Sequence, residues 1–105
     1  MTRMRTHPGE VLKEDYLVPL GMSARALAAE LDVPANRVSE IVRGQRDVTA
    51  DTALRLARYF ETDPRFWLNL QAAHDLSKAQ AAHDYSAIKP RRVVMRQTPA
   101  ANETR

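Results

Sequence analysis

The sequence contains no cysteine, only three glycines and few aromatic residues, which make up 6% of its 105 positions. Without cysteine, the chain cannot form a disulfide framework, a thiolate zinc site or a cysteine nucleophile. It has no glycine-rich phosphate loop, and no nucleophile-elbow motif occurs. These absences predict a protein that is not an enzyme, uses no metal ion or other cofactor, and acts on no small-molecule substrate.

Long hydrophobic runs are absent as well. No apolar stretch approaches the roughly 20 residues that a membrane-spanning helix needs. The basic residues near the N-terminus are not followed by the apolar stretch of a secretory signal. We therefore expect a cytoplasmic protein with no membrane contact. A chain of 105 residues, 44% of them hydrophobic, fits one domain with a modest core, which favours a homodimer as a way of burying further surface.

The positive charge of the chain is concentrated at its two ends. The net charge is +3, but residues 1–6 carry +2 and residues 87–105 carry +4, so residues 7–86 carry −3. We expect a folded domain over residues 1–86 and a basic, flexible extension over residues 87–105. The extension could remain a solvated end, or its basic residues could touch DNA phosphates. Val93–Met95 could also form a short strand that pairs with a partner protein.

The spacing of apolar residues predicts an all-α protein of five helices. The first helix runs from His7-Pro8 to about Leu17, where Pro19 stops it and Gly21 turns the chain. The other four helices begin at a capping residue or a proline, namely Ser23, Pro34, Thr49 and Asp63-Pro64. The last one extends to about residue 84. The residues expected on the apolar faces of these helices are Val11, Leu12, Tyr16, Ala24, Leu27, Ala28, Leu31, Val38, Ile41, Val42, Ala53, Leu56, Ala57, Phe60, Phe66, Trp67, Leu70 and Ala73.

Residues 23–46 have the pattern of a helix-turn-helix, in which the second of two short helices enters the DNA major groove. Asp32 lies in the turn and tolerates the left-handed conformation that such a turn often needs. The segment 34–46 contains three arginines and one acidic residue, so its local charge is positive. The turn, the apolar stripes and this charge favour DNA binding over the alternative that the polar faces only solvate the surface.

The outward face of the third helix carries side chains that can read bases. Arginine can bind guanine, and asparagine adenine, through two hydrogen bonds, and alanine can touch a thymine methyl group. The predicted base-reading residues are Ala35, Asn36, Arg37, Ser39, Glu40 and Arg43. Residues at helix ends fit contacts with phosphates, which position the protein without reading sequence. The predicted phosphate-contacting residues are Ser23, Arg25, Gln45, Arg46 and Thr49.

The three histidines and one aromatic pair have simpler interpretations than a second function. His7, His74 and His83 are too scattered for a local metal-binding motif. We interpret His7 as a helix cap and the other two as surface or interface residues. Phe66 and Trp67 are adjacent on a helix and cannot both face the core, so one of them could cover a partner protein.

Taken together, these residues resemble the HigA antitoxins, which belong to the lambda-repressor-like helix-turn-helix group. The resemblance covers about residues 7–76. Its distinctive pieces are His7-Pro8-Gly9-Glu10, Leu20-Gly21-Met22-Ser23, Val33-Pro34-Ala35-Asn36-Arg37, Thr49-Ala50-Asp51-Thr52-Ala53-Leu54-Arg55-Leu56-Ala57 and Phe66-Trp67-Leu68-Asn69-Leu70-Gln71. The chain departs from the wider group at Pro34, where a serine often caps the recognition helix, and at Asp32, which replaces the usual glycine. Both departures suggest a tighter turn.

The resemblance implies a five-helix fold and a homodimer that reads a palindromic operator. It also implies a partner toxin, typically a HigB-like ribosome-dependent mRNA endonuclease, which the antitoxin neutralises while it represses its own operon. Two alternatives stay open. One is a solitary transcriptional regulator without a toxin. The other is a toxin-binding module without useful DNA affinity, which the negative charge of residues 7–86 would fit.

Overall fold

The computed structural model describes residues 5–94, and over this range the chain forms helices, turns and extended segments but no strand. The helical segments are α1 (Pro8–Val11), the π-helical segment η1 (Leu12–Leu17), α2 (Val18–Leu20), α3 (Ala24–Leu31), α4 (Ala35–Val42), α5 (Ala50–Phe60) and α6 (Pro64–Ala82). Because α1, η1 and α2 follow one another without a break, they make one rod. The predicted all-α, five-helix fold is therefore confirmed.

The first helix is longer than predicted, because Pro19 does not stop it. The chain stays helical through Pro19, and the helix ends at Leu20. Gly21 follows in a left-handed conformation with φ 62°. The N–H of Val18 bonds to the carbonyl of Lys13, five residues back. In a regular α-helix the proline ring clashes with the carbonyl four residues earlier. The wider π turn displaces the preceding carbonyls from their α-helical positions, and the helix can then accommodate the proline.

The predicted starts of α1, α3, α5 and α6 are confirmed by side-chain hydrogen bonds at their caps. His7 Nδ1 accepts from the N–H of Gly9 at 2.9 Å, and Ser23 Oγ accepts from the N–H of Ala26 at 3.0 Å. The side chains of Thr49 and Asp63 cap α5 and α6 in the same way. The last helix ends at Ala82, slightly before the predicted residue 84.

The core lies between η1, α3, α4, α5 and the first half of α6. Its largest fully buried side chains include Trp67, Leu12, Leu27, Ile41 and Leu56, each no more than 1% exposed. Most of the residues predicted on the apolar faces of the helices are buried or pack against this core. The aromatic pair divides as expected: Trp67 is fully buried, and Phe66 is 38% exposed.

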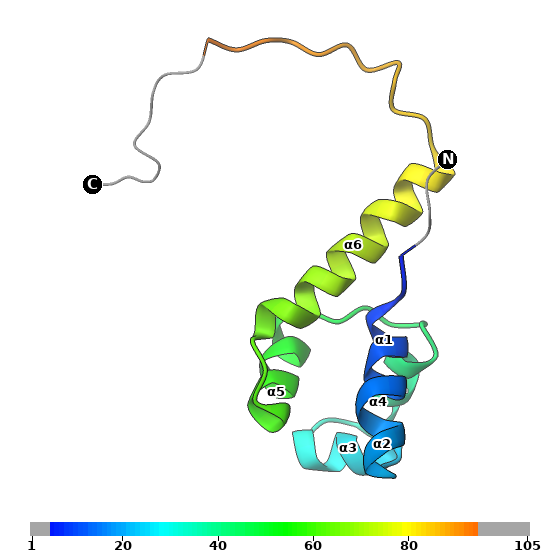
Figure 1. Cartoon of the computed structure of the whole chain (residues 1–105), viewed down its shortest axis with the longest axis vertical. Coiled ribbons are helices and arrows are strands. Elements are labelled where there is room, and N and C mark those ends of the chain that lie inside the picture. The colour runs from blue at the N-terminus through cyan, green and yellow to red at the C-terminus, as the bar shows by residue number, and fades with distance from the viewer. Residues whose placement is uncertain (1–4, 95–105) are drawn as a thin grey trace, which may run out of the picture.

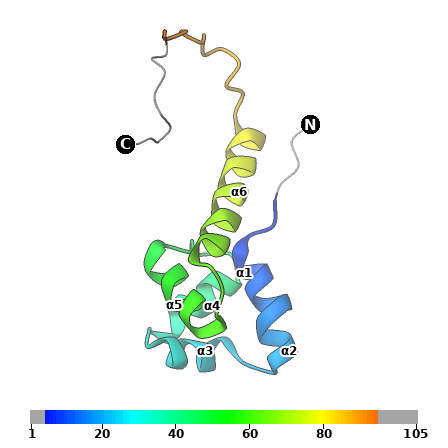
Figure 2. The same ribbon diagram turned by 60° about the vertical axis from the view of Figure 1, so that its left-hand side comes forward.

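The second half of α6 extends away from the other helices, as both Figure 1 and Figure 2 show. The N-terminal segment lies along it: the N–H of Arg5 donates to Ser77 Oγ at 2.8 Å, and His74 Nδ1 donates to the carbonyl of Arg5 at 2.7 Å. Beyond Ala82 the described chain is exposed and forms neither helix nor strand. The strand considered at Val93–Met95 is therefore not formed at its first two residues, and Met95 lies outside the described range. The division into residues 1–86 and 87–105 stays a prediction.

Candidate nucleic-acid interface

The turn between α3 and α4 fixes how these two helices are placed. Asp32 has φ 60° and ψ 49°, so the predicted left-handed turn residue is confirmed. The N–H of Val33 donates to the carbonyl of Ala28 at 3.0 Å, and the N–H of Asp32 donates to the carbonyl of Ala29 at 3.2 Å. This pair of bonds is a Schellman closure, which satisfies carbonyls at the end of α3. The side chain of Val33 packs against the core, and Pro34 then occupies the N-cap position of α4 without a side-chain hydrogen bond.

α4 has one buried face and one face open to solvent. Val38 and Ile41 are buried at 1% and 0% exposure and anchor the helix. The predicted base-reading residues lie on α4 or at its C-cap: Ala35, Asn36 and Arg43 are exposed, and Arg37, Ser39 and Glu40 are partly exposed. The structure therefore brings this set together on a single helix.

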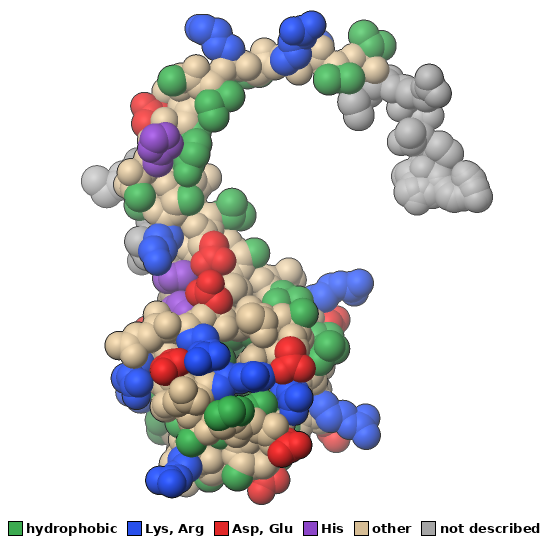
Figure 3. Space-filling view, turned by 180° about the vertical axis from the view of Figure 1, so that it is seen from behind, with side chains coloured by type: hydrophobic (Ala, Val, Ile, Leu, Met, Phe, Trp, Pro, Cys, Tyr) green, Lys and Arg blue, Asp and Glu red, His purple; other side chains and the backbone are tan. Residues whose placement is uncertain are grey.

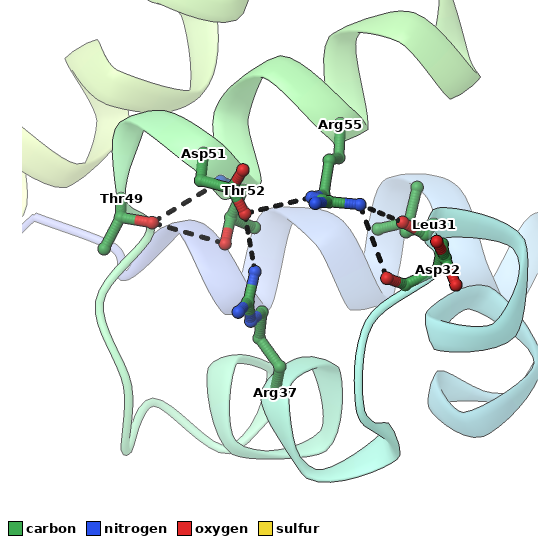
Figure 4. Close-up of polar contacts among 7 residues, drawn as sticks. All are labelled: Leu31, Asp32, Arg37, Thr49, Asp51, Thr52 and Arg55. Carbon is green, nitrogen blue, oxygen red and sulfur yellow. Dashed lines mark hydrogen bonds and ion pairs between the residues drawn. The ribbon is translucent and has the colours of Figure 1, made fainter.

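Arg37 is held by residues of α5, as Figure 4 shows. Its Nη1 lies 2.7 Å from Asp51 Oδ2, and the same oxygen accepts from Arg55 Nε at 2.9 Å. Arg55 Nη1 also donates to the carbonyl of Leu31 at 2.7 Å, in the last turn of α3. The two guanidinium groups hold the pKa of Asp51 below its usual value, because both donate to its ionised carboxylate. We call Arg37, Asp51 and Arg55 the arginine clamp.

Two other arginines of the predicted DNA-binding set, Arg46 and Arg43, also have partners. Arg46 forms an ion pair with Glu40 at 2.8 Å, which joins a predicted phosphate-contacting residue to a predicted base-reading residue. Arg43 Nε donates to Gln45 Oε1 at 3.2 Å. Exposed ion pairs of this kind contribute little to stability, typically about 0–1 kcal/mol, so DNA phosphates can compete for the arginines.

Two predicted phosphate contacts, Ser23 and Thr49, use their hydroxyl groups to cap helices. Ser23 caps α3 and Thr49 caps α5, and Arg25 lies exposed in the first turn of α3. The N-terminus of a helix carries partial positive charge and free N–H groups, which suits it for anions. These residues therefore offer backbone N–H groups more than side-chain hydroxyls to a phosphate.

The loop between α4 and α5, which carries Gln45 and Arg46, is fastened to α6 by Gln71. Gln71 is 6% exposed; its Oε1 accepts from the N–H of Val48 at 2.7 Å, and its Nε2 donates to Asp47 and Asp75. Sequence reasoning missed this residue. The available signal was its position four residues after Trp67, where a polar side chain falls on the buried side of the helix.

His7 and His74 meet, although they are 67 positions apart in the chain. Their rings lie edge to face, with centroids 4.9 Å apart. The predicted role of His7 as a cap is confirmed, and His74, predicted as a surface or interface residue, packs against it inside the chain. Burial lowers the pKa of His7, and the neighbouring His74 lowers it further. Within residues 5–94, no group of three histidine, aspartate or glutamate side chains could hold a metal ion.

Charges of both signs are mixed over the helical body. Figure 3 shows Lys and Arg interspersed with Asp and Glu on one face of it, whereas the basic side chains of the C-terminal segment stand apart from acidic ones in this view. Among the described residues, no helix has the length and apolar character that crossing a membrane would require.

Comparison with known proteins agrees with this geometry. Residues 12–67 match the Helix-turn-helix family. The chain is 60% identical over 74 residues to virulence-associated protein I of Dichelobacter nodosus, covering 70% of this chain and 68% of that protein. It is 37% identical over 92 residues to antitoxin HigA-1 of Vibrio cholerae, covering 86% and 87% of the two chains.

A solved structure gives the same result. The Pseudomonas aeruginosa antitoxin HigA with higBA promoter superposes with a TM-score of 0.72 at 48% identity, covering 73% of this chain and 84% of that chain. The fold and the exposed face of α4 define a helix-turn-helix protein of the kind that regulates transcription. Within that class, this chain belongs to the HigA antitoxin family. The family consists of DNA-binding regulators, which agrees with the prediction that the protein is not an enzyme.

Proposed function

We propose that this protein is an antitoxin that binds the operator of its own operon as a homodimer, represses it, and neutralises a HigB-like toxin. The observation that carries the proposal is the exposed polar set on α4, from Ala35 to Arg43, held in place by a buried apolar face. A related HigA with the same fold was solved with its promoter DNA. We expect the protein to act in the cytoplasm, where its operator and its toxin are found.

In the proposed complex, α4 lies in the major groove and reads bases. Asn36 and Arg43 are the exposed residues able to make paired hydrogen bonds with adenine and guanine. The N-termini of α3 and α5, with Arg25 and Arg46, contact phosphates on either side. A two-fold symmetric dimer places two such helices about 34 Å apart, so we expect two half-sites separated by one turn of DNA.

Fluorescence anisotropy with the protein's own upstream DNA and a scrambled duplex, at two salt concentrations, tests this proposal. We expect tight, selective binding with two protomers per site. Replacing Asn36 or Arg43 by Ala should weaken operator binding by about 1–3 kcal/mol, the usual cost of one good base contact. Arg65→Ala, which removes an exposed arginine of α6, is the matched control and should have no effect. If all the α4 variants, including Arg37→Ala, keep the selectivity of the wild-type protein for operator DNA, the assigned reading face is wrong.

A second experiment tests the proposed toxin partner. We expect a neighbouring gene of about a hundred codons encoding a small basic protein. Co-expression with this antitoxin should rescue growth and yield a stable complex in size-exclusion chromatography. Selective operator binding without such a neighbour would indicate a solitary regulator.

A protein-binding module without useful DNA affinity is the second candidate function. The net charge of −3 over residues 7–86 favours it, since a negative domain is repelled by DNA. Equal, weak and steeply salt-dependent binding to both duplexes would support this candidate, because basic termini alone adhere to any phosphate backbone.

A further inference from the structure

We propose that Asp51 is a specificity-determining residue of the DNA-binding surface, although it lies outside the helix that reads the bases. It acts through Arg37: its carboxylate holds the guanidinium in one place and prevents it from binding phosphates at random. This inference rests on the proposed function, because it concerns how the same surface separates operator from other DNA.

The arginine clamp gives Asp51 a fixed position. Asp51 Oδ2 accepts from Arg55 Nε at 2.9 Å, and Arg55 Nη1 donates in turn to the carbonyls of Leu31 and Asp32 at 2.7 and 3.4 Å. Leu31 is the last residue of α3, and Asp32 lies in the turn that joins α3 to α4. The carboxylate is therefore located relative to the helix-turn-helix itself, and not only relative to α5 (Figure 4).

Asp51 in turn locates Arg37. The bond from Arg37 Nη1 to Asp51 Oδ2 is 2.7 Å, and the Arg37 side chain is only 28% exposed while the Asp51 side chain is 57% exposed. Arginine has five N–H donors in a rigid plane, so a guanidinium bound through Nη1 keeps other donors for DNA. A long side chain held in this way loses less conformational entropy when it meets a matching base or phosphate.

The same carboxylate makes non-matching contacts less favourable. A free arginine on this surface would bind any nearby phosphate and release a counterion, which raises non-specific affinity. With Asp51 present, a phosphate reached by swinging Arg37 away must replace an existing ion pair. Operator DNA avoids this replacement when its groups lie where the held guanidinium already points, so the clamp favours operator over other DNA.

The variant Asp51→Asn tests this mechanism, because it removes the charge while keeping the size of the side chain. In the full-length protein, we expect Asp51→Asn to tighten binding to a scrambled duplex. The slope of log K against log salt should become steeper by about 0.9, which is the value for one additional phosphate contact. The ratio of scrambled to operator Kd should fall about 5- to 100-fold, the range for removing one positioned base contact.

Asp84→Asn is the matched control. Asp84 is an exposed carboxylate two residues beyond the end of α6, and the second half of α6 extends away from the other helices (Figure 1); its replacement makes the same change in net charge. It should leave the slope and the Kd ratio close to those of the wild-type protein. The double variant Arg37→Ala/Asp51→Asn should show the same Kd ratio as Arg37→Ala alone, because Asp51 acts through Arg37.

Three results would overturn the proposal. If Asp51→Asn and Asp84→Asn change the slope and the ratio equally, the effect is one of net charge. If Asp51→Asn still changes the ratio in the Arg37→Ala background, it acts by itself. If the wild-type protein binds operator and scrambled DNA equally well, the proposed function itself fails, and the role of Asp51 fails with it. The titration of the wild-type protein is enough to recognise this outcome, without any variant.

Discussion

Single residues determine how several helices of this protein end. α5 ends at Phe60 and is followed by Glu61 with φ 57°, and α3 ends at Leu31 and is followed by Asp32 with φ 60°. A left-handed conformation costs a residue with a Cβ atom roughly 1–2 kcal/mol, and aspartate tolerates it better than glutamate. The end of α5 therefore contains a residue whose backbone is strained.

Replacing Glu61 by Gly should stabilise the protein. Glycine adopts the left-handed conformation without the Cβ clash, but it also gives the unfolded chain more conformational freedom. With both effects counted, we expect the free energy of unfolding to rise by about 0.5–1 kcal/mol. Urea denaturation measures it. The control Glu30→Gly, inside α3, should destabilise by about 1 kcal/mol because that position is helical. A destabilised Glu61→Gly protein would show that the glutamate side chain makes a contact that outweighs the strain.

The partly buried position of His7 should make stability depend on pH. Its pKa is lowered from 6.5 by burial and by His74, while Asp47 and Asp75 act in the opposite direction. The folded protein therefore holds His7 neutral at pH values where the unfolded chain already takes up a proton. The stabilising effect is complete above about pH 6.5 and is lost as the pH falls through the lowered pKa.

Thermal unfolding between about pH 7.5 and 5.5 measures this dependence. The variant His7→Asn can still cap α1 but cannot titrate, so its melting temperature should fall less on acidification than that of the wild-type protein. His83→Asn, at an exposed position after α6, is the control and should behave like wild type. Equal acid sensitivity of all three proteins would assign the effect to other groups.

At the scale of helices, the sequence predicted element types and starts well. Capping residues and apolar spacing are local signals, so the starts of α1, α3, α5 and α6 follow from residues such as Ser23 and Asp63. The stop at Pro19 was wrong because it assumed α-helical hydrogen bonding. Gln71 and the arginine clamp were missed because their partners come from other elements, and no local pattern shows which elements pack together. The predicted base-reading residues do share one face of α4, whereas their contacts with DNA stay a prediction.

Gly9 allows α1 and α4 to approach each other closely. A Cβ atom placed on Gly9 would overlap the backbone carbonyl of Ile41 in α4, which cannot move away as a flexible side chain could. We expect Gly9→Ala to destabilise the protein by at least about 1–3 kcal/mol, as overpacking does. Gly21→Ala is the comparison, because it meets no atom within 4 Å and carries only the cost of its positive φ. If calorimetry shows Gly21→Ala to be the more damaging change, the two helices can separate without cost.

Gln71 connects α6 with the loop that precedes α5. Gln71→Ala leaves the N–H of Val48 without its partner, and an unsatisfied buried group costs about 1–3 kcal/mol. We also expect weaker operator binding, because the loop carrying Gln45 and Arg46 is no longer fastened. Gln80→Ala, an exposed position on the same helix, is the control for both unfolding and anisotropy measurements. Unchanged operator affinity in a destabilised Gln71→Ala protein would limit its role to stability.

At the scale of the whole molecule, charge and fold are separated along the chain. The described core residues lie between Leu12 and Trp67, whereas residues 87–105 carry a net charge of +4. Ending the chain after residue 86 should therefore leave the melting temperature unchanged and weaken binding to scrambled DNA. The slope of log K against log salt should become shallower by roughly 0.9 for each phosphate that the extension no longer neutralises. Operator selectivity should rise. A lower melting temperature would show that the extension packs against the domain.

The π-helical segment η1 has a consequence for the shape of the molecule. A π turn contains one residue more than the α-helical turn it replaces. If the same six residues of η1 took up α-helical bonding, α1 would rotate by about 100° relative to α2, because each residue of an α-helix turns the chain by that angle. Gly9 would then turn away from α4, and His7 would leave His74. The π turn thus absorbs the surplus residue without this rotation, and the N-terminal segment keeps its direction alongside α6.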